Sequence, residues 1–115
     1  MRVLIVGAGP TGLTAAIELA RMGVVPDVVE RLSEPSSFSR AVGILPSSLR
    51  LLQPSGATDR ILEEGVALQR AVMFSGNKQL LDLQLVDPKR DYPTSIALAQ
   101  NRTETILRDV FNGYG

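Results

Sequence analysis

The sequence predicts an α/β fold that begins with a Rossmann-like βαβ unit, and three observations near the amino terminus support this prediction. The first is a β-branched run, Val3–Val6, of the kind found in strands that are buried on both faces. The second is the Gly-x-Gly-x-x-Gly spacing of Gly7, Gly9 and Gly12 directly after that run. The third is a second apolar run, residues 24–30, which ends in a glutamate. Dinucleotide-binding proteins typically have, in this order, a strand, a glycine turn, a helix and a second strand that ends in an acidic residue.

Each residue of the glycine turn has a separate expected role. Gly7 permits a tight turn, Gly9 lets a pyrophosphate approach the backbone, and Gly12 lets the following helix pack closely on the strand. Pro10 suits the first position of a helix because its missing amide hydrogen would be unpaired there anyway. With Thr11 it opens a helix whose free amides and positive dipole end face the phosphates. All five are candidate cofactor-binding residues.

A helix and a second strand are expected after the turn. The helical repeat consists of Leu13, Ala16, Ile17 and Ala20. Gly23 should end the helix, and the strand should run from about residue 26 to Glu30. Glu30 lies near the distance from the glycines at which a ribose is normally held. Its carboxylate would accept hydrogen bonds from a ribose 2′-hydroxyl and repel a 2′-phosphate.

The composition is that of an ordinary globular domain and argues against several functions. The chain has 115 residues, 44% of them apolar and 21% charged, and a net charge of zero. This charge balance gives no electrostatic basis for a nucleic acid or an anionic membrane as partner. Cysteine and histidine are absent, so we expect no disulfide, thiolate nucleophile, imidazole base or zinc site. The glycine motif begins too early to leave room for a signal peptide, which predicts a cytoplasmic location.

The middle of the sequence predicts two helices. One helical pattern covers residues 48–52 and ends before a proline and a glycine. Another covers residues 58–64, with Thr58 as a candidate cap and with Ile61 and Leu62 facing inward.

A β-hairpin and a last helix are expected further along the chain. Two extended runs, 69–75 and 79–85, flank a Gly-Asn pair and predict the hairpin. Residues 95–100 look extended and lead into the helix. Asn101 and Glu104 have the spacing of a capping box, and a Glu104–Arg108 ion pair would add roughly 0.2–0.5 kcal/mol to helix stability.

This set of strands falls short of a complete nucleotide-binding sheet. A doubly wound sheet needs several parallel strands, whereas the sequence predicts two clear ones near its amino end. We therefore predict that residues 1–115 are an incomplete fragment of a larger FAD/NAD(P)-binding type of fold, or that a homo-oligomer or partner chain completes the sheet.

Five segments occur in the order seen in flavoprotein aromatic hydroxylases. They are GAGPTGLTAAIELARMG, VVER, SRAVGILPSSLRLL, GATDRILEEG and ALAQNRTETIL. The chain thus resembles the FAD-dependent monooxygenases typified by p-hydroxybenzoate and phenol hydroxylases, and most of all the polyketide and aromatic-ring hydroxylases. The resemblance covers essentially the whole chain. Glu30 with Arg31, the stretch 39–41, and Gln100 with Thr103 and Glu104 make it more specific than the glycines alone.

The resemblance implies FAD as the cofactor. By position, the three glycines would line the pyrophosphate and Glu30 would hold the adenosine ribose. Arg31 would lie along the adenine side, and Arg40 would contact FAD near the pyrophosphate or ribitol. Gln100 would hydrogen-bond the ribitol-pyrophosphate region.

The chain also departs from the family pattern. Many relatives have Arg-Thr where this chain has Ser47-Ser48, and a glutamate where it has Arg50. We therefore expect no cofactor contact through that arginine. The later Asp-Gly and Gly-Asp motifs and the substrate domain would lie beyond residue 115, so no catalytic residue is assigned.

The function implied by the resemblance is the FAD-binding amino-terminal portion of a monooxygenase. Such an enzyme hydroxylates a small aromatic or polyketide substrate, with NAD(P)H as a transient co-substrate and O2 as oxidant. Two alternatives stay open. The chain could be a truncated, non-catalytic FAD-binding or interaction module that needs a partner, or a fragment of an NAD-linked dehydrogenase, since Glu30 suits NAD as well.

Overall fold

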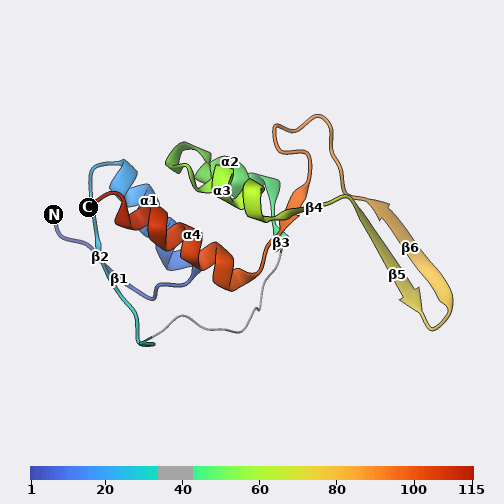
Figure 1. The fold of residues 1–115 in the computed structure, drawn as a ribbon, viewed down its shortest axis with the longest axis horizontal. Helices are drawn as coiled ribbons and strands as arrows, with labels where there is room; N and C mark the ends of the chain where they lie inside the picture. The colour runs from blue at the N-terminus through green and yellow to red at the C-terminus, as the bar shows by residue number, and fades with distance from the viewer. Residues whose placement is uncertain (34–42) are drawn as a thin grey trace.

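The computed structural model describes residues 1–33 and 43–115 and shows a mixed α/β fold (Figure 1). β1 (Leu4–Val6) and β2 (Asp27–Val29) pair in parallel, and α1 (Pro10–Arg21) connects them. The predicted Rossmann-like βαβ unit is therefore confirmed, with strands of three residues each.

The inward face of α1 matches the predicted repeat. Its buried residues are Leu13, Ala16, Ile17 and Ala20. Gly23 follows the helix with a φ of +90°, in the left-handed region, and its amide donates to the carbonyl oxygen of Ala20 at 3.0 Å. This glycine therefore turns the chain away from the helix axis, as predicted.

A second, antiparallel sheet lies near the middle of the molecule. It contains β3 (Gly43–Ile44), β7 (Ser95–Ala97) and β4 (Val66–Leu68), with β7 in the centre. The extended character of residues 95–97 was predicted. β3 and β4 were not, because strands of two and three residues are too short to show alternation.

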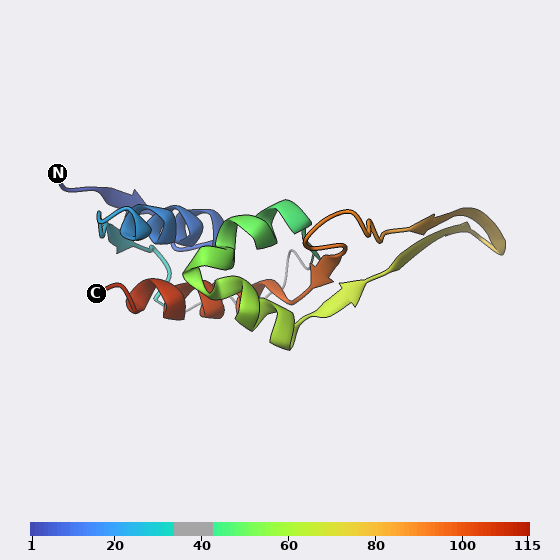
Figure 2. The same cartoon turned by 90° about the horizontal axis from the view of Figure 1, so that it is seen from above.

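Three further helices form one core with α1. They are α2 (Pro46–Leu52), which continues as a 3₁₀ turn over Gln53–Ser55, α3 (Ala57–Glu64) and α4 (Gln100–Asn112). α4 packs along α1, and α3 packs on α4 (Figures 1 and 2). The core cluster consists of Leu13, Ile17, Leu49, Leu52, Ala57, Ile61, Ile96, Ile106 and Leu107.

Two details of the predicted α3 are wrong. Thr58 is not a cap, because the helix is preceded by Gly56 and the Thr58 hydroxyl instead donates to the carbonyl oxygen of Leu49 at 2.5 Å. Thr58 is fully buried, so this bond joins α3 to α2 and satisfies a hydroxyl that has no access to water. Leu62 is 42% exposed, since α3 buries only the face that carries Ala57, Thr58 and Ile61.

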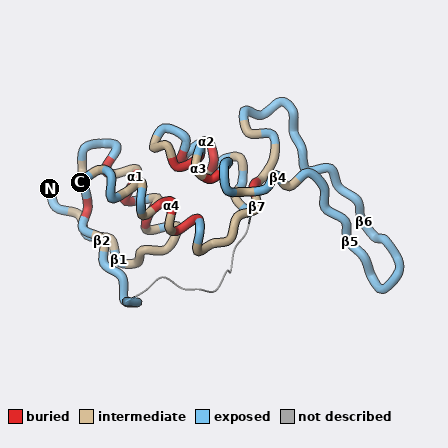
Figure 3. Tube along the Cα trace, viewed as in Figure 1, coloured by how far each residue is buried: buried red, intermediate tan, exposed pale blue. Residues whose placement is uncertain are grey.

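The predicted burial of β1 on both faces is also wrong. Leu4 is 60% exposed and Val6 is 80% exposed. Figure 3 shows no buried position along β1. The cause is that β1 pairs only with β2 in the described residues, so the parallel sheet has two strands and α1 covers only one of its faces. The sequence pattern predicts a buried strand, but in the structure the apolar side chains of Leu4 and Val6 are left uncovered.

The predicted β-hairpin is confirmed and projects from the body of the molecule. β5 (Arg70–Ser75) and β6 (Lys78–Gln84) pair antiparallel and lie at the end opposite the two termini (Figures 1 and 2). Gly76 turns the chain with a φ of +58°. Every residue of both strands is exposed. The projection accounts for a radius of gyration of 16.5 Å, against about 13 Å for a compact chain of this length.

The start of α4 differs from the prediction. Ala99 is the residue before the helix and makes no side-chain cap, so Asn101 lies inside the first turn and the capping box is wrong. Glu104 accepts a hydrogen bond from Gln100 instead, and the ion pairs of the described ranges include none between Glu104 and Arg108.

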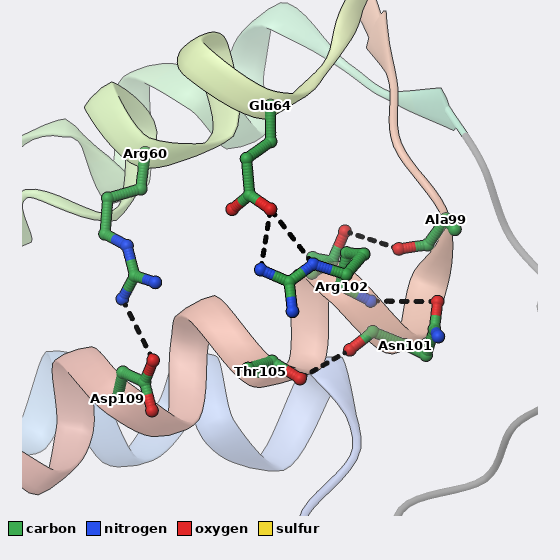
Figure 4. A network of polar contacts seen from close by, with 8 residues as sticks. Arg60, Glu64, Ala99, Asn101, Arg102, Thr105 and Asp109 are labelled. Carbon is green, nitrogen blue, oxygen red and sulfur yellow. Dashed lines mark hydrogen bonds and ion pairs between the residues drawn. The ribbon is translucent and has the colours of Figure 1, made fainter.

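Two ion pairs join α3 to α4 on the outer surface (Figure 4). Arg102 contacts Glu64 at 2.6 Å, and Arg60 contacts Asp109 at 3.2 Å. All four side chains are at least a third exposed except Glu64, which is 32% exposed, so these pairs contribute little to the free energy of unfolding.

Candidate functional site

The glycine turn between β1 and α1 has the geometry that the spacing predicted. Gly7 has a φ of +108°, which an L side chain rarely adopts, and its amide donates to the carbonyl oxygen of Val29 at 2.7 Å. A Cβ on Gly12 would lie 2.0 Å from the carbonyl oxygen of Gly7, so turn and helix are in direct contact there. A Cβ on Gly9 would meet nothing within 4 Å. The backbone at Gly9 is therefore open to a ligand.

The amino end of α1 is suited to an anion. The first intrahelical bond runs from the Leu13 amide to the Gly9 carbonyl oxygen at 2.9 Å, so the amides of Thr11 and Gly12 have no partner carbonyl within the helix. No side chain caps this end, and the first turn carries no acidic residue. Free amides and the positive end of the helix dipole thus lie next to the open backbone of Gly9.

Glu30 lies at the same turn, as the sequence predicted for a strand-end acid. Its carboxylate accepts from the Ala8 amide at 2.8 Å and from the Leu32 amide at 3.2 Å. The hydrogen bond from Ala8, followed by that from Leu32, lowers the pKa of the Glu30 carboxyl below its usual value. Glu30 is therefore held as a carboxylate beside the glycine turn, where it can accept further hydrogen bonds.

The depressed pKa of Glu30 predicts an acid-dependent contribution to stability. A carboxyl with a lowered folded-state pKa stabilises the fold above its unfolded pKa of 4.5, and this contribution is lost as the pH falls through 4.5 towards the folded-state value. We expect Glu30→Gln to lower the melting temperature at pH 7, and we expect the difference from wild type to shrink as the pH falls below 4.5. Thermal melts of both proteins from pH 7 to pH 3 measure this. Two curves that stay equally far apart at all pH values would contradict it.

A pocket of about 260 Å³ lies where three helices begin. Its lining residues are Pro10, Thr14, Gly43, Ile44, Leu45, Ser48, Leu52, Leu98, Gln100, Thr103 and Leu107. Pro10 and Gln100, predicted from opposite ends of the sequence, line this one pocket. Both are the first residues of their helices, so the amino ends of α1 and α4 open onto the same space. The pocket is too small for a whole dinucleotide and could hold only part of one.

The structure places the remaining predicted site residues, Thr11, Arg31 and Arg40, outside the pocket or does not describe them. Thr11 is exposed at the start of α1, and Arg31 is exposed just after β2. Arg40 lies outside the described residues. Within the described ranges, no group of three or more His, Cys, Asp or Glu side chains could hold a metal ion. No helix of those ranges is long and apolar enough to cross a membrane.

Sequence reasoning missed most of the pocket wall. Gly43, Ile44 and Leu45 come from β3 and the start of α2, and Thr14 comes from the second turn of α1. The one local signal was Pro46, which suits the first turn of a helix and places the residues before it at the helix entrance. The contact of these residues with α1 and α4 depends on tertiary packing, which the local sequence does not show.

The fold and the site geometry are those of the class of α/β proteins that bind dinucleotides at a glycine turn. A family model described as an FAD binding domain matches residues 1–113. The chain therefore belongs to this family of FAD binding domains, which confirms the family predicted from the resemblance and FAD as its cofactor.

Individual relatives are monooxygenases. The 6-methylpretetramide 4-monooxygenase of Streptomyces rimosus is 36% identical over 116 residues, which cover 99% of this chain and 21% of that protein. The crystal structure of p-nitrophenol 4-monooxygenase from Pseudomonas putida matches with a TM-score of 0.86 and 29% identity, over 96% of this chain and 29% of that one. Anhydrotetracycline hydroxylase from Streptomyces rimosus matches with a TM-score of 0.83 and 33% identity, over 100% of this chain and 23% of that one. The chain thus spans less than a third of each relative.

Proposed function

We propose that residues 1–115 form the amino-terminal part of the FAD-binding domain of a flavoprotein monooxygenase. That enzyme would hydroxylate a small aromatic or polyketide molecule with NAD(P)H and O2, in the cytoplasm, where NAD(P)H is available. The observation that carries the proposal is the open glycine turn with Glu30 and the uncapped end of α1 beside it, in a chain of the FAD binding domain family. The names of the relatives support the reaction and the substrate class.

The proposal gives each part of the site a binding role. Gly7, Gly9 and Gly12 would line the pyrophosphate, which the amides of Thr11 and Gly12 and the dipole of α1 would stabilise. Glu30 would accept from the adenosine ribose. Bound FAD supplies the redox chemistry, and the residues of this chain bind and orient it.

Three further residues would complete the contacts made by this chain. Arg31 would lie along the adenine side, and Arg40 would contact FAD near the pyrophosphate or ribitol. Gln100 would reach the ribitol-pyrophosphate region from the pocket that it shares with Pro10. We assign no catalytic residue to this chain.

The purified protein is expected to bind FAD and to turn yellow. Flavin absorbance at about 450 nm should remain after gel filtration and should return when FAD is added to stripped protein. Parallel titrations with NAD⁺ give the comparison, and FAD should bind far more tightly. Colourless protein that cannot be reconstituted with FAD, or a preference for NAD⁺, would overturn the proposal in favour of a dehydrogenase-type site.

As the alternative to a sheet completed by later residues of a longer protein, we propose that β1 gains further strands from a second copy or a partner chain. Leu4 and Val6 are mostly exposed, and β1 has a strand neighbour on one side only in the described residues. An apolar strand with a free edge is a surface that other strands cover. Light scattering of the isolated chain across a dilution series should show self-association. A stable monomer that consumes NADPH in the presence of O2 would count against this proposal and against a truncated, non-catalytic module.

A further inference from the structure

Gln100 and Glu104 form a hydrogen-bonded pair one turn apart at the start of α4. Nε2 of Gln100 donates to Oε1 of Glu104 at 2.8 Å. Gln100 lines the pocket, whereas Glu104 does not. Glu104 is only 8% exposed, which is unusual for a glutamate. The carboxylate therefore acts on the pocket only through the amide of Gln100.

The chemistry of the pair fixes the orientation of the Gln100 amide. A glutamine side chain can turn its NH2 group or its carbonyl oxygen towards a neighbour, and both orientations occupy nearly the same volume. A carboxylate has no proton to donate, so it accepts only the orientation with NH2 towards it. The carbonyl oxygen of Gln100 is consequently the atom turned away from Glu104.

Neither a cap nor an ion pair of α4 explains the carboxylate at this position. Glu104 does not cap the helix, and its side chain makes no ion pair with Arg108 in the described ranges. Removing a carboxylate from water is costly unless a specific partner compensates. The partner that Glu104 has is the amide that faces the pocket.

We propose that Glu104 is a positioning residue for FAD: it holds the Gln100 amide in the one orientation in which Gln100 binds the cofactor. This inference rests on the proposed function, in which Gln100 contacts the ribitol-pyrophosphate region. The inference adds Glu104, a residue that does not touch FAD and that determines which atom of the Gln100 side chain contacts FAD.

The test compares four variants with the wild-type protein. They are Gln100→Ala, Glu104→Met, Glu104→Gln and the double variant Gln100→Ala/Glu104→Met. FAD affinity is measured by the change in flavin fluorescence on titration of stripped protein. The melting temperature of the same FAD-free protein is measured in parallel. Methionine at 104 keeps the length of the side chain and removes the acceptor, and glutamine keeps an acceptor oxygen.

The proposal gives a specific pattern of results. Gln100→Ala should weaken FAD binding about 10-fold, and Glu104→Met should weaken it about 3- to 10-fold, the range for loss of one hydrogen bond. Glu104→Gln should give an affinity between those of wild type and Glu104→Met, because its carbonyl oxygen can accept from Nε2 of Gln100 while its NH2 group can also donate to Oε1. In the Gln100→Ala background, Glu104→Met should have no further effect, because its target is gone. The melting temperature of FAD-free Glu104→Met should stay close to that of wild type, because the removed desolvation cost of the buried carboxylate offsets the lost hydrogen bond to the half-buried amide of Gln100.

Each other outcome has a definite meaning. If Glu104→Met lowers affinity and melting temperature together, its role is structural and the inference is overturned. If Gln100→Ala weakens binding and Glu104→Met does not, the inference fails while the proposed function stands. If Gln100→Ala leaves FAD binding unchanged, the assigned role of Gln100 fails, and this inference fails with it.

Arg102→Ala provides the matched control on the same helix turn. It removes the exposed ion pair with Glu64 and leaves the Gln100–Glu104 pair intact. We expect FAD affinity within about 2-fold of wild type, as for other exposed ion pairs. A loss as large as that of Glu104→Met would show that any change at the start of α4 disturbs the site, and would overturn the inference.

Discussion

Gly12→Ala should destroy the nucleotide-binding turn and abolish FAD binding. The new Cβ would lie 2.0 Å from the carbonyl oxygen of Gly7 and 3.1 Å from its carbonyl carbon. These are backbone atoms, so α1 must move away from the turn or the turn must rearrange. Overpacking in a core commonly costs about 1–3 kcal/mol of stability. Because the backbone of Gly7 cannot give way as a side chain can, we expect the cost here to lie at or above the upper end of that range. A thermal melt and an FAD titration of the variant measure both losses.

Gly9→Ala is the control that separates folding from binding. Gly9 has an ordinary φ of −79°, and its Cβ would meet nothing within 4 Å, so alanine fits without strain. The free energy of unfolding should stay within about 0.5 kcal/mol of wild type. FAD affinity should nevertheless fall, by about 10-fold or more, because the methyl group would stand where the pyrophosphate approaches the backbone. Wild-type melting of Gly12→Ala, or wild-type FAD affinity of Gly9→Ala, would contradict this account of the turn.

The contrast between these two glycines shows which parts of the fold the sequence predicts. Close approach at Gly12 and open backbone at Gly9 both follow from the motif spacing, because turn geometry depends on a few adjacent residues. The hairpin around Gly76 and the buried face of α1 are local in the same sense. Each is specified by turn residues or by one period within about a dozen residues.

Two of the errors concern features that depend on distant parts of the chain, and the third concerns the choice between two local partners. The apolar pattern of β1 is that of a buried strand, yet Val6 is exposed because burial requires a neighbouring strand or covering layer. Thr58 has the residue type of a cap and instead bonds to Leu49, a residue of another helix. Glu104 has the spacing of a capping box and instead holds Gln100. Thr58 thus has a tertiary partner in place of the predicted local one, whereas Glu104 has a different local partner, four residues before it in the same helix.

The candidate site likewise has one part that could be predicted from the sequence and one part that could not. Glu30 and the glycine turn could be placed together from sequence because the carboxyl ends of adjacent parallel strands meet at one edge of a sheet. The pocket shared by Pro10 and Gln100 could not, since it exists only where α1 and α4 pack with their first residues at the same end. The importance of Gln100 came from resemblance to a family, and its binding role stays a prediction.

Ile106→Ala tests whether the packing of α4 on α1 supports the site. Ile106 is fully buried in the core cluster that joins the four helices. Truncation of a buried isoleucine to alanine costs about 2–5 kcal/mol through lost transfer free energy and the cavity left behind. Domains are stable by only about 5–15 kcal/mol, so the melting temperature should fall sharply or the fold should be lost. Ile106→Val should cost about 0.5–1.5 kcal/mol, and Leu51→Ala, at a half-exposed position, should cost less than Ile106→Ala.

Added FAD then distinguishes a weakened fold from a damaged site. A ligand that binds only the folded state stabilises it by about 2.7 kcal/mol at 100 times its dissociation constant. If Ile106→Ala leaves the pocket intact in the folded molecules, FAD should raise the melting temperatures of the variant and the wild type similarly. If α4 moves away from α1, Gln100 and Pro10 separate, and the gain from FAD should shrink in the variant alone. We expect the second result, because Leu107, next to Ile106, lines the pocket itself. Equal gains from FAD would show that the glycine turn and Glu30 bind the cofactor without help from α4.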